Sequence, residues 1–288
     1  MKKIKQLLGY FCWLPLFINR FLGFFTLRSN ESLRVLLYHD IPEHQLELFS
    51  KQIHFLHKHY QFIDFKTFSK MMAGELPVEG RNLFLTFDDG FLSNKLAVQN
   101  ILNPLHIKGC FFVLPNFIEC QATEIKKFVA ARICDSNITE DEISPYLNPM
   151  SWDDLEYLLA SGHTLGSHTN SHFRLATLKD TALIKSEVID SGDRLEAKLG
   201  VKINCFAYPF GTIESINKTV LFFAASRYRF IFSGIRGENK KNNTIFIYRE
   251  EISPNYSAKY VRFIVEGGLS PGYYFKRKKL RRMAKIDE

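Results

Sequence analysis

Beyond residue 30, short apolar runs alternate with longer segments whose apolar positions recur at helical spacing. The short runs are rich in β-branched and aromatic residues, which is typical of buried strands. We expect strands at Arg34–Tyr38, Gln61–Phe65, Asn82–Phe87, Gly109–Leu114, Thr164–Gly166, Asn204–Ala207, Tyr228–Phe232 and Ile245–Tyr248. We expect helices at Leu46–Tyr60, Thr67–Ala73, Leu92–Leu105, Ser151–Ala160, Asp180–Leu199, from about Ile213, and at Ala258–Glu266.

Repeated strand–helix units predict a parallel sheet with helices packed outside it. Roughly seven strands over about 245 residues favour a closed or partly closed barrel, with an open doubly wound sheet as the alternative. Local signals support the helix boundaries. Ser151 stands at an N-cap with Asp154 three residues later, and Gly162 suits the turn that ends that helix. The stretch Glu119–Met150 is long for a loop and is expected to hold inserted helices.

The first thirty residues differ in character from the rest. Three lysines precede the apolar run Leu7–Ile18, and Asn19-Arg20 separate it from a second apolar run, Phe21–Leu27. The first run is too short to span a bilayer, and Arg20 is costly inside a longer span. No A-x-A-like cleavage site follows, although a cleaved signal stays possible. We interpret the segment as an apolar helix that associates with a membrane surface, or alternatively as a helix that caps the main domain.

Composition and charge narrow the class of protein. The chain has 288 residues, 46% of them hydrophobic, and a formal net charge of +8 that is concentrated at its ends. No nucleic-acid-binding motif accompanies this charge, so basic ends beside an apolar segment favour an anionic membrane surface, with solvated tails as the alternative. Five cysteines without CxxC spacing exclude a disulfide framework and a structural zinc site, and they mildly favour a reducing compartment.

Three polar clusters each follow a predicted strand: Thr86–Gly90 (TFDDG), Gly166–His172 (GSHTNSH) and Ala207–Gly211 (AYPFG). Strand ends converge on one face of a β/α barrel, so the clusters should share one pocket. Two imidazoles and one carboxylate form a three-ligand site with positions left open for water and substrate. A second, unligated carboxylate can accept a proton from water, and an N–H donor can stabilise an oxyanion. The set therefore predicts metal-assisted hydrolysis.

These motifs resemble the first three motifs of the polysaccharide deacetylase family (NodB homology, carbohydrate esterase family 4). The run Met150–Thr169 also resembles the family's approach to its histidine motif, and the likeness covers roughly Leu33–Glu266. The motif layout is most similar to the poly-N-acetylglucosamine deacetylase-like subgroup. The resemblance implies an α/β fold, a deformed (β/α)7 barrel, and one divalent metal ion, with Zn²⁺ the expected species.

The resemblance also implies roles for individual residues. Asp88 matches the catalytic base, and Asp89, His168 and His172 match the metal ligands. Tyr208 matches the residue whose backbone N–H helps to bind the oxyanion. Trp152 and Pro209 are expected to bind substrate or to support the site. Thr169 and Ser171 are expected to hold the histidine loop, with generic loop polarity as the alternative.

The chain departs from the family pattern at two points. Ala207 replaces an arginine of the third motif, so Arg249 is the candidate for tuning Asp88. No histidine follows His172, where many members carry their general acid. His39 lies in a Tyr-His pair at the end of the first predicted strand, as in the poly-N-acetylglucosamine subgroup, and is the expected acid. A packed or strand-capping histidine is the alternative for this position.

The sequence thus predicts a metal-dependent hydrolase that removes N-acetyl groups from amino sugars of a bacterial surface polysaccharide or its lipid-linked precursor. An O-acetyl esterase and a non-catalytic glycan-binding or membrane scaffold are the alternatives. We expect a membrane-associating segment at 1–30, a deacetylase domain at 31–270 and a basic tail at 271–288. The expected location is the bacterial inner membrane, with the cytoplasmic side favoured and a periplasmic or secreted location left open. The expected partners are an acetylated glycan or lipid-linked sugar and a membrane surface, and no nucleic acid.

Overall fold

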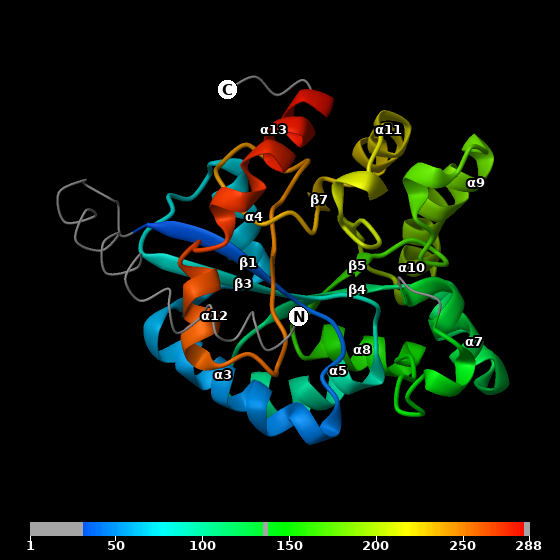
Figure 1. The fold of residues 1–288 in the computed structure, drawn as a ribbon, viewed down its shortest axis with the longest axis horizontal. Helices are drawn as coiled ribbons and strands as arrows, with labels where there is room; N and C mark the ends of the chain where they lie inside the picture. Colours follow the sequence, from blue (N-terminus) through cyan, green and yellow to red (C-terminus); the bar gives the residue numbers. More distant parts are fainter. Residues whose placement is uncertain (1–30, 135–137, 285–288) are drawn as a thin grey trace.

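A curled parallel sheet forms the centre of the computed structural model, which describes residues 31–134 and 138–284 (Figure 1). The strands run in the order β7-β6-β5-β4-β3-β1-β8, and β2 pairs with the start of β3. Their bounds are β1 Ser32–Tyr38, β2 Gln61–Phe62, β3 Arg81–Phe87, β4 Gly109–Val113, β5 Thr164–Ser167, β6 Cys205–Ala207, β7 Phe230–Phe232 and β8 Glu250–Glu251.

The chain between β7 and β8 joins the two edges of this sheet. Ile247 forms a parallel bridge with Phe232 of β7, and the N–H of Arg249 donates to the carbonyl of Ile235 at 3.0 Å. Directly after Arg249, β8 begins and pairs in parallel with Leu36 and Leu37 of β1. The predicted deformed (β/α)7 barrel is therefore confirmed, with one short irregular segment spanning the gap between β7 and β1.

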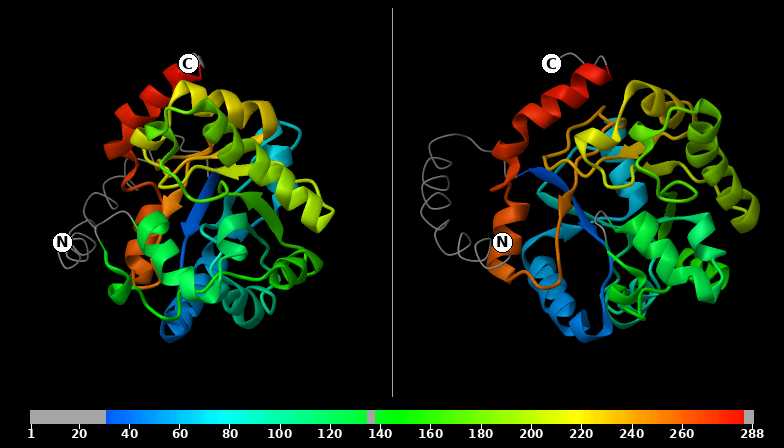
Figure 2. Two further views of the ribbon diagram at one scale, coloured as in Figure 1. Left: turned by 90° about the vertical axis from the view of Figure 1, so that its right-hand side faces the viewer. Right: turned by 45° about the vertical axis from the view of Figure 1, so that its right-hand side comes forward.

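Helices surround the sheet, and one of them, α4 (Phe65–Ala73), fills the barrel from its amino-terminal end (Figure 2). Phe68 of α4 stacks on Phe84 of β3 with ring centroids 4.4 Å apart, and it also contacts Phe232 of β7 at 5.9 Å. Asp64 caps the helix by accepting from the N–H of Thr67 at 2.8 Å. The apolar plug leaves the carboxyl ends of the strands as the open, polar end of the barrel.

The outer helices follow the periodicity of the sequence. They are α3 Leu46–His59, α5 Leu92–Ala97, α8 Trp152–Ala160, α9 Thr181–Lys185, α10 Ser191–Leu199, α11 Lys218–Arg227, α12 Ala258–Val265 and α13 Tyr274–Met283. The predicted capping box is present, because Ser151 and Asp154 exchange side-chain-to-backbone bonds of 2.8 and 3.2 Å. The predicted helix over 180–199 is divided by a wider turn at Ser186–Asp190.

One predicted strand is largely absent from the structure, and one predicted insertion is present. The strand expected at Ile245–Tyr248 is reduced to the single bridge at Ile247, because the chain there crosses from β7 to β1 instead of running beside one strand. The inserted helices expected within Glu119–Met150 are present as the short helix α7 (Ile125–Phe128) and single helical turns, following α6 (Pro115–Ile118). These pack around a small apolar cluster of their own, which includes Phe117 and Val129.

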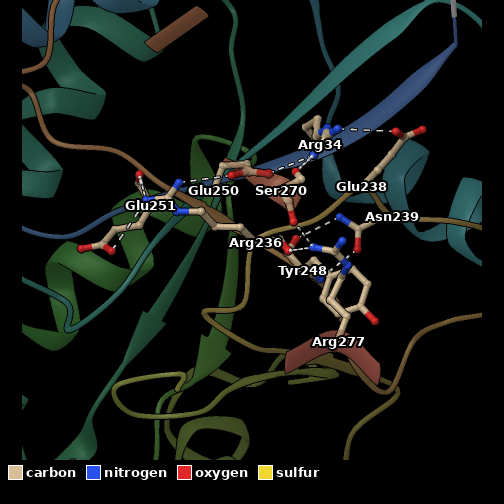
Figure 3. Close-up of polar contacts among 9 residues, drawn as sticks. All are labelled: Arg34, Arg236, Glu238, Asn239, Tyr248, Glu250, Glu251, Ser270 and Arg277. Carbon is tan, nitrogen blue, oxygen red and sulfur yellow. Dashed lines mark hydrogen bonds and ion pairs between the residues drawn. The ribbon is translucent and has the colours of Figure 1, made fainter. Parts of the chain in front are cut away.

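A buried polar network holds the closing segment to β1 (Figure 3). Glu250 is fully buried and accepts from Arg34 at 2.9 Å and from Arg236 at 3.1 Å. Arg277 of α13 donates to the carbonyls of Arg236 and Ser270, both at 2.8 Å. The network thus ties β1, the closing segment and α13 together.

Two predictions concern the ends of the chain, an apolar segment and a basic tail. The apolar segment expected at residues 1–30 lies outside the described residues. Within residues 31–134 and 138–284, no helix combines the length and the apolar composition that crossing a bilayer requires. Part of the basic stretch at 271–288 forms α13, whose Leu280 is buried in the core.

Candidate active site

The polar clusters that follow β3, β5 and β6 meet at the open end of the barrel. The sheet ladder continues into the first two clusters and fixes where each one begins. The N–H of Asp88 donates to the carbonyl of Tyr38 at 3.0 Å, and the N–H of His168 donates to the carbonyl of Val113 at 3.0 Å. Asp88, Asp89, His168 and His172 are all at least 96% buried.

Several residues of these loops have a left-handed backbone that is unusual outside glycine. The φ angle is +71° at Asp89, +73° at Thr169, +58° at His172 and +61° at Phe210. Such conformations are unfavourable for residues with a Cβ and persist where the surrounding structure enforces them, which occurs most often at functional sites. The hydroxyl of Thr169 helps here by accepting from the N–H of His172 at 3.0 Å.

Asp89, His168 and His172 direct three possible metal-ligand atoms toward one point. Oδ1 of Asp89 lies 3.5 Å from Nε2 of His168 and 3.3 Å from Nε2 of His172. The potential ligand atoms of the three residues all lie within 4.8 Å of one another. The three predicted ligands are thus brought together by two loops that are separated by more than seventy residues of sequence.

The other nitrogen of each imidazole is engaged by a backbone carbonyl. Nδ1 of His168 lies 2.8 Å from the carbonyl oxygen of Ala207, and Nδ1 of His172 lies 2.7 Å from that of Arg132. A carbonyl can only accept, so both Nδ1 atoms carry the proton and a neutral ring presents the lone pair of Nε2. This arrangement is the one found for histidines that bind metals.

The residues present fit a divalent cation. Oδ1 of Asp89 is buried and has no hydrogen-bond donor among the described residues, although a carboxylate oxygen without a partner is costly to bury. Burial lowers the pKa of the His168 imidazole to about 4 and keeps it neutral. Burial also acts against a charge on His172, but contact with Asp89 raises the pKa of that imidazole overall. The cluster therefore attracts positive charge at the point where its lone pairs converge.

Asp88 lies beside this cluster and is bound by Arg249. The two Nη atoms of Arg249 donate to the two carboxylate oxygens of Asp88 at 2.6 and 2.8 Å. Nε of Arg249 donates to the carbonyl of Ser233, and its guanidinium lies over the ring of Phe112. Burial alone would raise the pKa of Asp88, but the charge and hydrogen bonds of Arg249 outweigh burial and hold this pKa below its usual range. Arg249 is therefore positioned to lower the pKa of Asp88, as the sequence predicted.

His39 directly follows β1 and is half-buried at the edge of the cluster. It lies close enough to Asp88 and Asp89 to interact electrostatically with both carboxylates. Asn94 fixes the backbone here by donating to the carbonyl of His39 at 2.7 Å. Trp152 begins α8, and Nζ of Lys198 lies 5.7 Å from its ring centroid.

The prediction for the backbone of Tyr208 is wrong. Its N–H donates to the carbonyl of Phe232 at 3.1 Å, because the β6–β7 ladder continues one residue beyond Ala207. Pro209 is buried beside it and has no N–H. The next N–H belongs to Phe210, which has no acceptor in the part of the chain that the structure describes. The Phe210 ring lies 4.7 Å from the ring of His172, so this residue borders the cluster.

The carbonyl of Arg132 is a contribution that the sequence did not indicate. Arg132 lies in the inserted region between β4 and β5, in the turn Val129–Ile133, and it reaches His172 through its main chain. A backbone carbonyl leaves no trace in side-chain patterns, so no motif could have marked it. The signal for Phe210 was available, because a residue beside Gly211 in a tight turn is a natural site for an exposed N–H.

Comparisons with known proteins agree with this geometry. The family described as polysaccharide deacetylase matches residues 76–227. Deacetylase PplD from Streptococcus pyogenes, solved in complex with acetate, is 20% identical, with a TM-score of 0.64 over 81% of this chain and 98% of its own. IcaB from Ammonifex degensii is 20% identical, with a TM-score of 0.65 over 83% and 98%.

A de-N-acetylase from Aggregatibacter actinomycetemcomitans is 15% identical, with a TM-score of 0.63 over 81% of this chain and all of the other. At these identities the solved structures establish the shared fold. A search of curated proteins gave no match.

Proposed function

This chain belongs to the polysaccharide deacetylase family, and on that premise we propose that it is a metal-dependent N-deacetylase. Its proposed substrates are N-acetylated amino sugars of a bacterial surface polysaccharide or of its lipid-linked precursor. The observation that carries the proposal is the convergence of three buried lone-pair donors on one point, with a separate ionised carboxylate beside them. A protein that served only as a scaffold has no physical need for both features.

We infer that Asp89, His168 and His172 hold one divalent ion, and that the nitrogen and oxygen donor set suits zinc. A zinc ion bound there supplies Lewis acidity toward the acetyl carbonyl and lowers the pKa of water. The carbonyls of Ala207 and Arg132 orient the two imidazoles, so the ligands are held in place before anything binds.

Asp88 acts as the general base in this proposal. Its Oδ2 lies 3.7 Å from Nε2 of His168, so the carboxylate is next to the ligands without being one of them. Arg249 binds both carboxylate oxygens, which keeps Asp88 ionised near neutral pH and fixes its orientation. The attacking water gives its proton to this carboxylate.

In this proposal, two groups at the edge of the site complete the reaction. One stabilises the negative charge of the oxyanion, and the other protonates the departing nitrogen. The N–H of Phe210 is the backbone donor that faces the developing oxyanion, in place of Tyr208. His39 gives a proton to the departing nitrogen. An amine is a poorer leaving group than an alcohol, so an acid in this position favours amide hydrolysis over ester hydrolysis.

We also propose that the protein works at the bacterial inner membrane, on the cytoplasmic side. The basic, apolar start of the chain and its odd number of cysteines support this location. The proposal includes no nucleic-acid partner, because the charge excess comes without a nucleic-acid-binding motif.

The test measures metal content and acetate release from N-acetylglucosamine oligomers in the same samples. We expect about one metal ion per wild-type chain, and loss of both metal and acetate release in His168→Ala/His172→Ala. Asp88→Asn is expected to keep its metal and to lose turnover by at least about a hundredfold, because the amide cannot accept the proton.

Other outcomes separate the parts of the proposal. Near wild-type turnover in Asp88→Asn would remove the assigned base. Metal binding without acetate release from oligomers, but with release from a lipid-linked acetylated sugar, would assign the precursor as substrate. Failure of the wild type to bind metal, even after addition of zinc, would overturn the metal-dependent mechanism.

A further inference from the structure

Helix α13 carries an unusual density of positive charge. Its ten residues, Tyr274–Met283, include six lysines and arginines and no acidic residue. Two aromatic residues, Tyr274 and Phe275, begin the helix. The proposed chemistry uses none of these side chains.

The inner side of α13 is fixed to the domain. Leu280 is fully buried in the core, and Arg277 donates two hydrogen bonds of 2.8 Å to the carbonyls of Arg236 and Ser270 (Figure 3). One face of α13 is therefore packed against the domain, and the opposite face is exposed.

The outer face combines aromatic and basic side chains. The side chain of Phe275 is 81% exposed and that of Tyr274 is 49% exposed. Lys278, Lys279 and Arg282 are exposed and lie four or seven residues beyond one or other of these aromatics, so all five project from the same side of the helix. A phenylalanine side chain with this exposed fraction is unfavourable in water. Aromatic rings flanked by lysine and arginine are typical of helices that lie in a membrane interface.

This face lies at the edge of the molecule. In Figures 1 and 2, α13 lies at the end that also carries α11, where Phe222 is a further exposed aromatic side chain. α13 also contacts the turn Ile213–Ser215, which directly follows the loop that carries Phe210. A surface that binds α13 would therefore approach the side of the barrel where the third polar cluster lies.

We propose that the outer face of α13 docks onto a bilayer containing anionic lipids. The basic side chains are complementary to the negative headgroups, and Phe275 enters the interface between headgroups and acyl chains. A soluble polyanion would explain the charge but would leave the exposed aromatic rings without a partner. The proposal concerns binding alone and does not depend on the deacetylase chemistry.

The test is co-sedimentation of the full-length protein with vesicles, without any sugar substrate. One set contains phosphatidylcholine alone, and the other contains about 30% phosphatidylglycerol in addition. The readout is the ratio of the two partition coefficients, which removes any binding of the apolar amino-terminal segment that does not depend on lipid charge. We expect the wild-type ratio to be well above one at low salt and to fall as salt increases.

The triple variant Lys278→Gln/Lys279→Gln/Arg282→Gln is expected to lower this ratio by about tenfold or more. A matched control, Lys51→Gln/Lys58→Gln/Lys126→Gln, removes the same number of exposed charges from α3 and α7 and is expected to keep the wild-type ratio. Phe275→Ser is expected to weaken binding to the phosphatidylglycerol vesicles without a change in net charge.

Two results would overturn the proposal. The first is a triple variant whose ratio falls no further than that of the matched control. The second is a Phe275→Ser protein that binds these vesicles as the wild type does, while soluble polyphosphate binds the wild type and competes fully. That second result would assign the face to a soluble polyanion.

Discussion

At the scale of single residues, hydrogen bonds decide which buried histidines can bind a cation. Nδ1 of His168 and His172 faces a carbonyl oxygen, so Nε2 is left as a lone-pair donor at the cluster. His163 is also buried but has the opposite arrangement. Its Nδ1 accepts from the N–H of Gly109 at 3.1 Å, and its Nε2 therefore donates to Asn103 at 3.1 Å. Both nitrogens of His163 are used, so it supports the fold in its neutral form.

His163 should make the stability of the protein depend on pH. Burial lowers the pKa of this imidazole from 6.5 to about 4. Between these two values the unfolded chain binds a proton that the folded chain does not, so stability is complete above pH 6.5 and falls as the pH decreases toward 4. The loss is on the order of 3 kcal/mol. Urea unfolding at pH 7 and pH 4.5 measures it.

His163→Gln serves as the comparison, because glutamine can accept and donate at similar positions without titrating. We expect the variant to lose clearly less stability than the wild type over the same pH interval. Other buried groups, including His168, titrate in both proteins and cancel in the difference. An equal loss in the two proteins would contradict the assignment.

At the scale of elements, β5 places His168 by packing against the barrel interior. Gly166 faces Phe112 of β4, and a Cβ at this glycine would lie 2.5 Å from the Phe112 ring and 3.0 Å from the Cβ of Cys205. Phe112 and Cys205 are both fully buried, so neither can move aside easily. The strand thus approaches its neighbours closely two residues before the first histidine ligand.

Gly166→Ala should therefore destabilise the protein by about 1–3 kcal/mol, because the methyl group overfills a packed interior. Displacement of β5 should also weaken metal binding through His168. Urea unfolding and metal titration are the measurements. Gly272→Ala is the control, because a Cβ there meets nothing within 4 Å. Equal unfolding midpoints for the two variants would show that β5 can shift without cost.

At the scale of the whole molecule, closure of the barrel depends on buried charges outside the metal-ligand cluster. Glu250 accepts from Arg34 and Arg236, and so joins the closing segment to the first strand (Figure 3). Arg249 precedes it and reaches Asp88 in the site. One short segment therefore orients the proposed base through Arg249 and closes the barrel through the next residue, Glu250.

Glu250→Ala should be strongly destabilising, because it leaves two buried guanidinium groups without their shared carboxylate. We expect a loss on the order of 3–5 kcal/mol. In a domain of this size that corresponds to a fall in Tm of roughly 10 °C. Glu251→Ala removes the neighbouring exposed carboxylate and should change stability by no more than about 0.5 kcal/mol. Similar melting temperatures for the two variants would show that the buried network contributes little.

The sequence by itself determined the elements and the residue types of the site. Strands, helices and caps depend on neighbours a few positions away, so local periodicity and residues such as Ser151 and Asp154 were enough to predict them. Asp88, Asp89, His168 and His172 could be found because they lie in the loops that follow β3 and β5, and strand ends in a parallel barrel share one face.

Only the tertiary structure decided which groups meet at the site. Arg249 and Asp88 are 161 residues apart, and the bond between their side chains requires the barrel to close in one particular register. The carbonyl of Arg132 and the free N–H of Phe210 belong to the main chain, which is the same at every position of a sequence. The N–H of Tyr208 is likewise a main-chain group, and its hydrogen bond to Phe232 in the β6–β7 ladder could not be predicted from side-chain patterns. Hydrogen bonds of the backbone depend on strand pairing and loop conformation, and these are fixed only when the chain is folded.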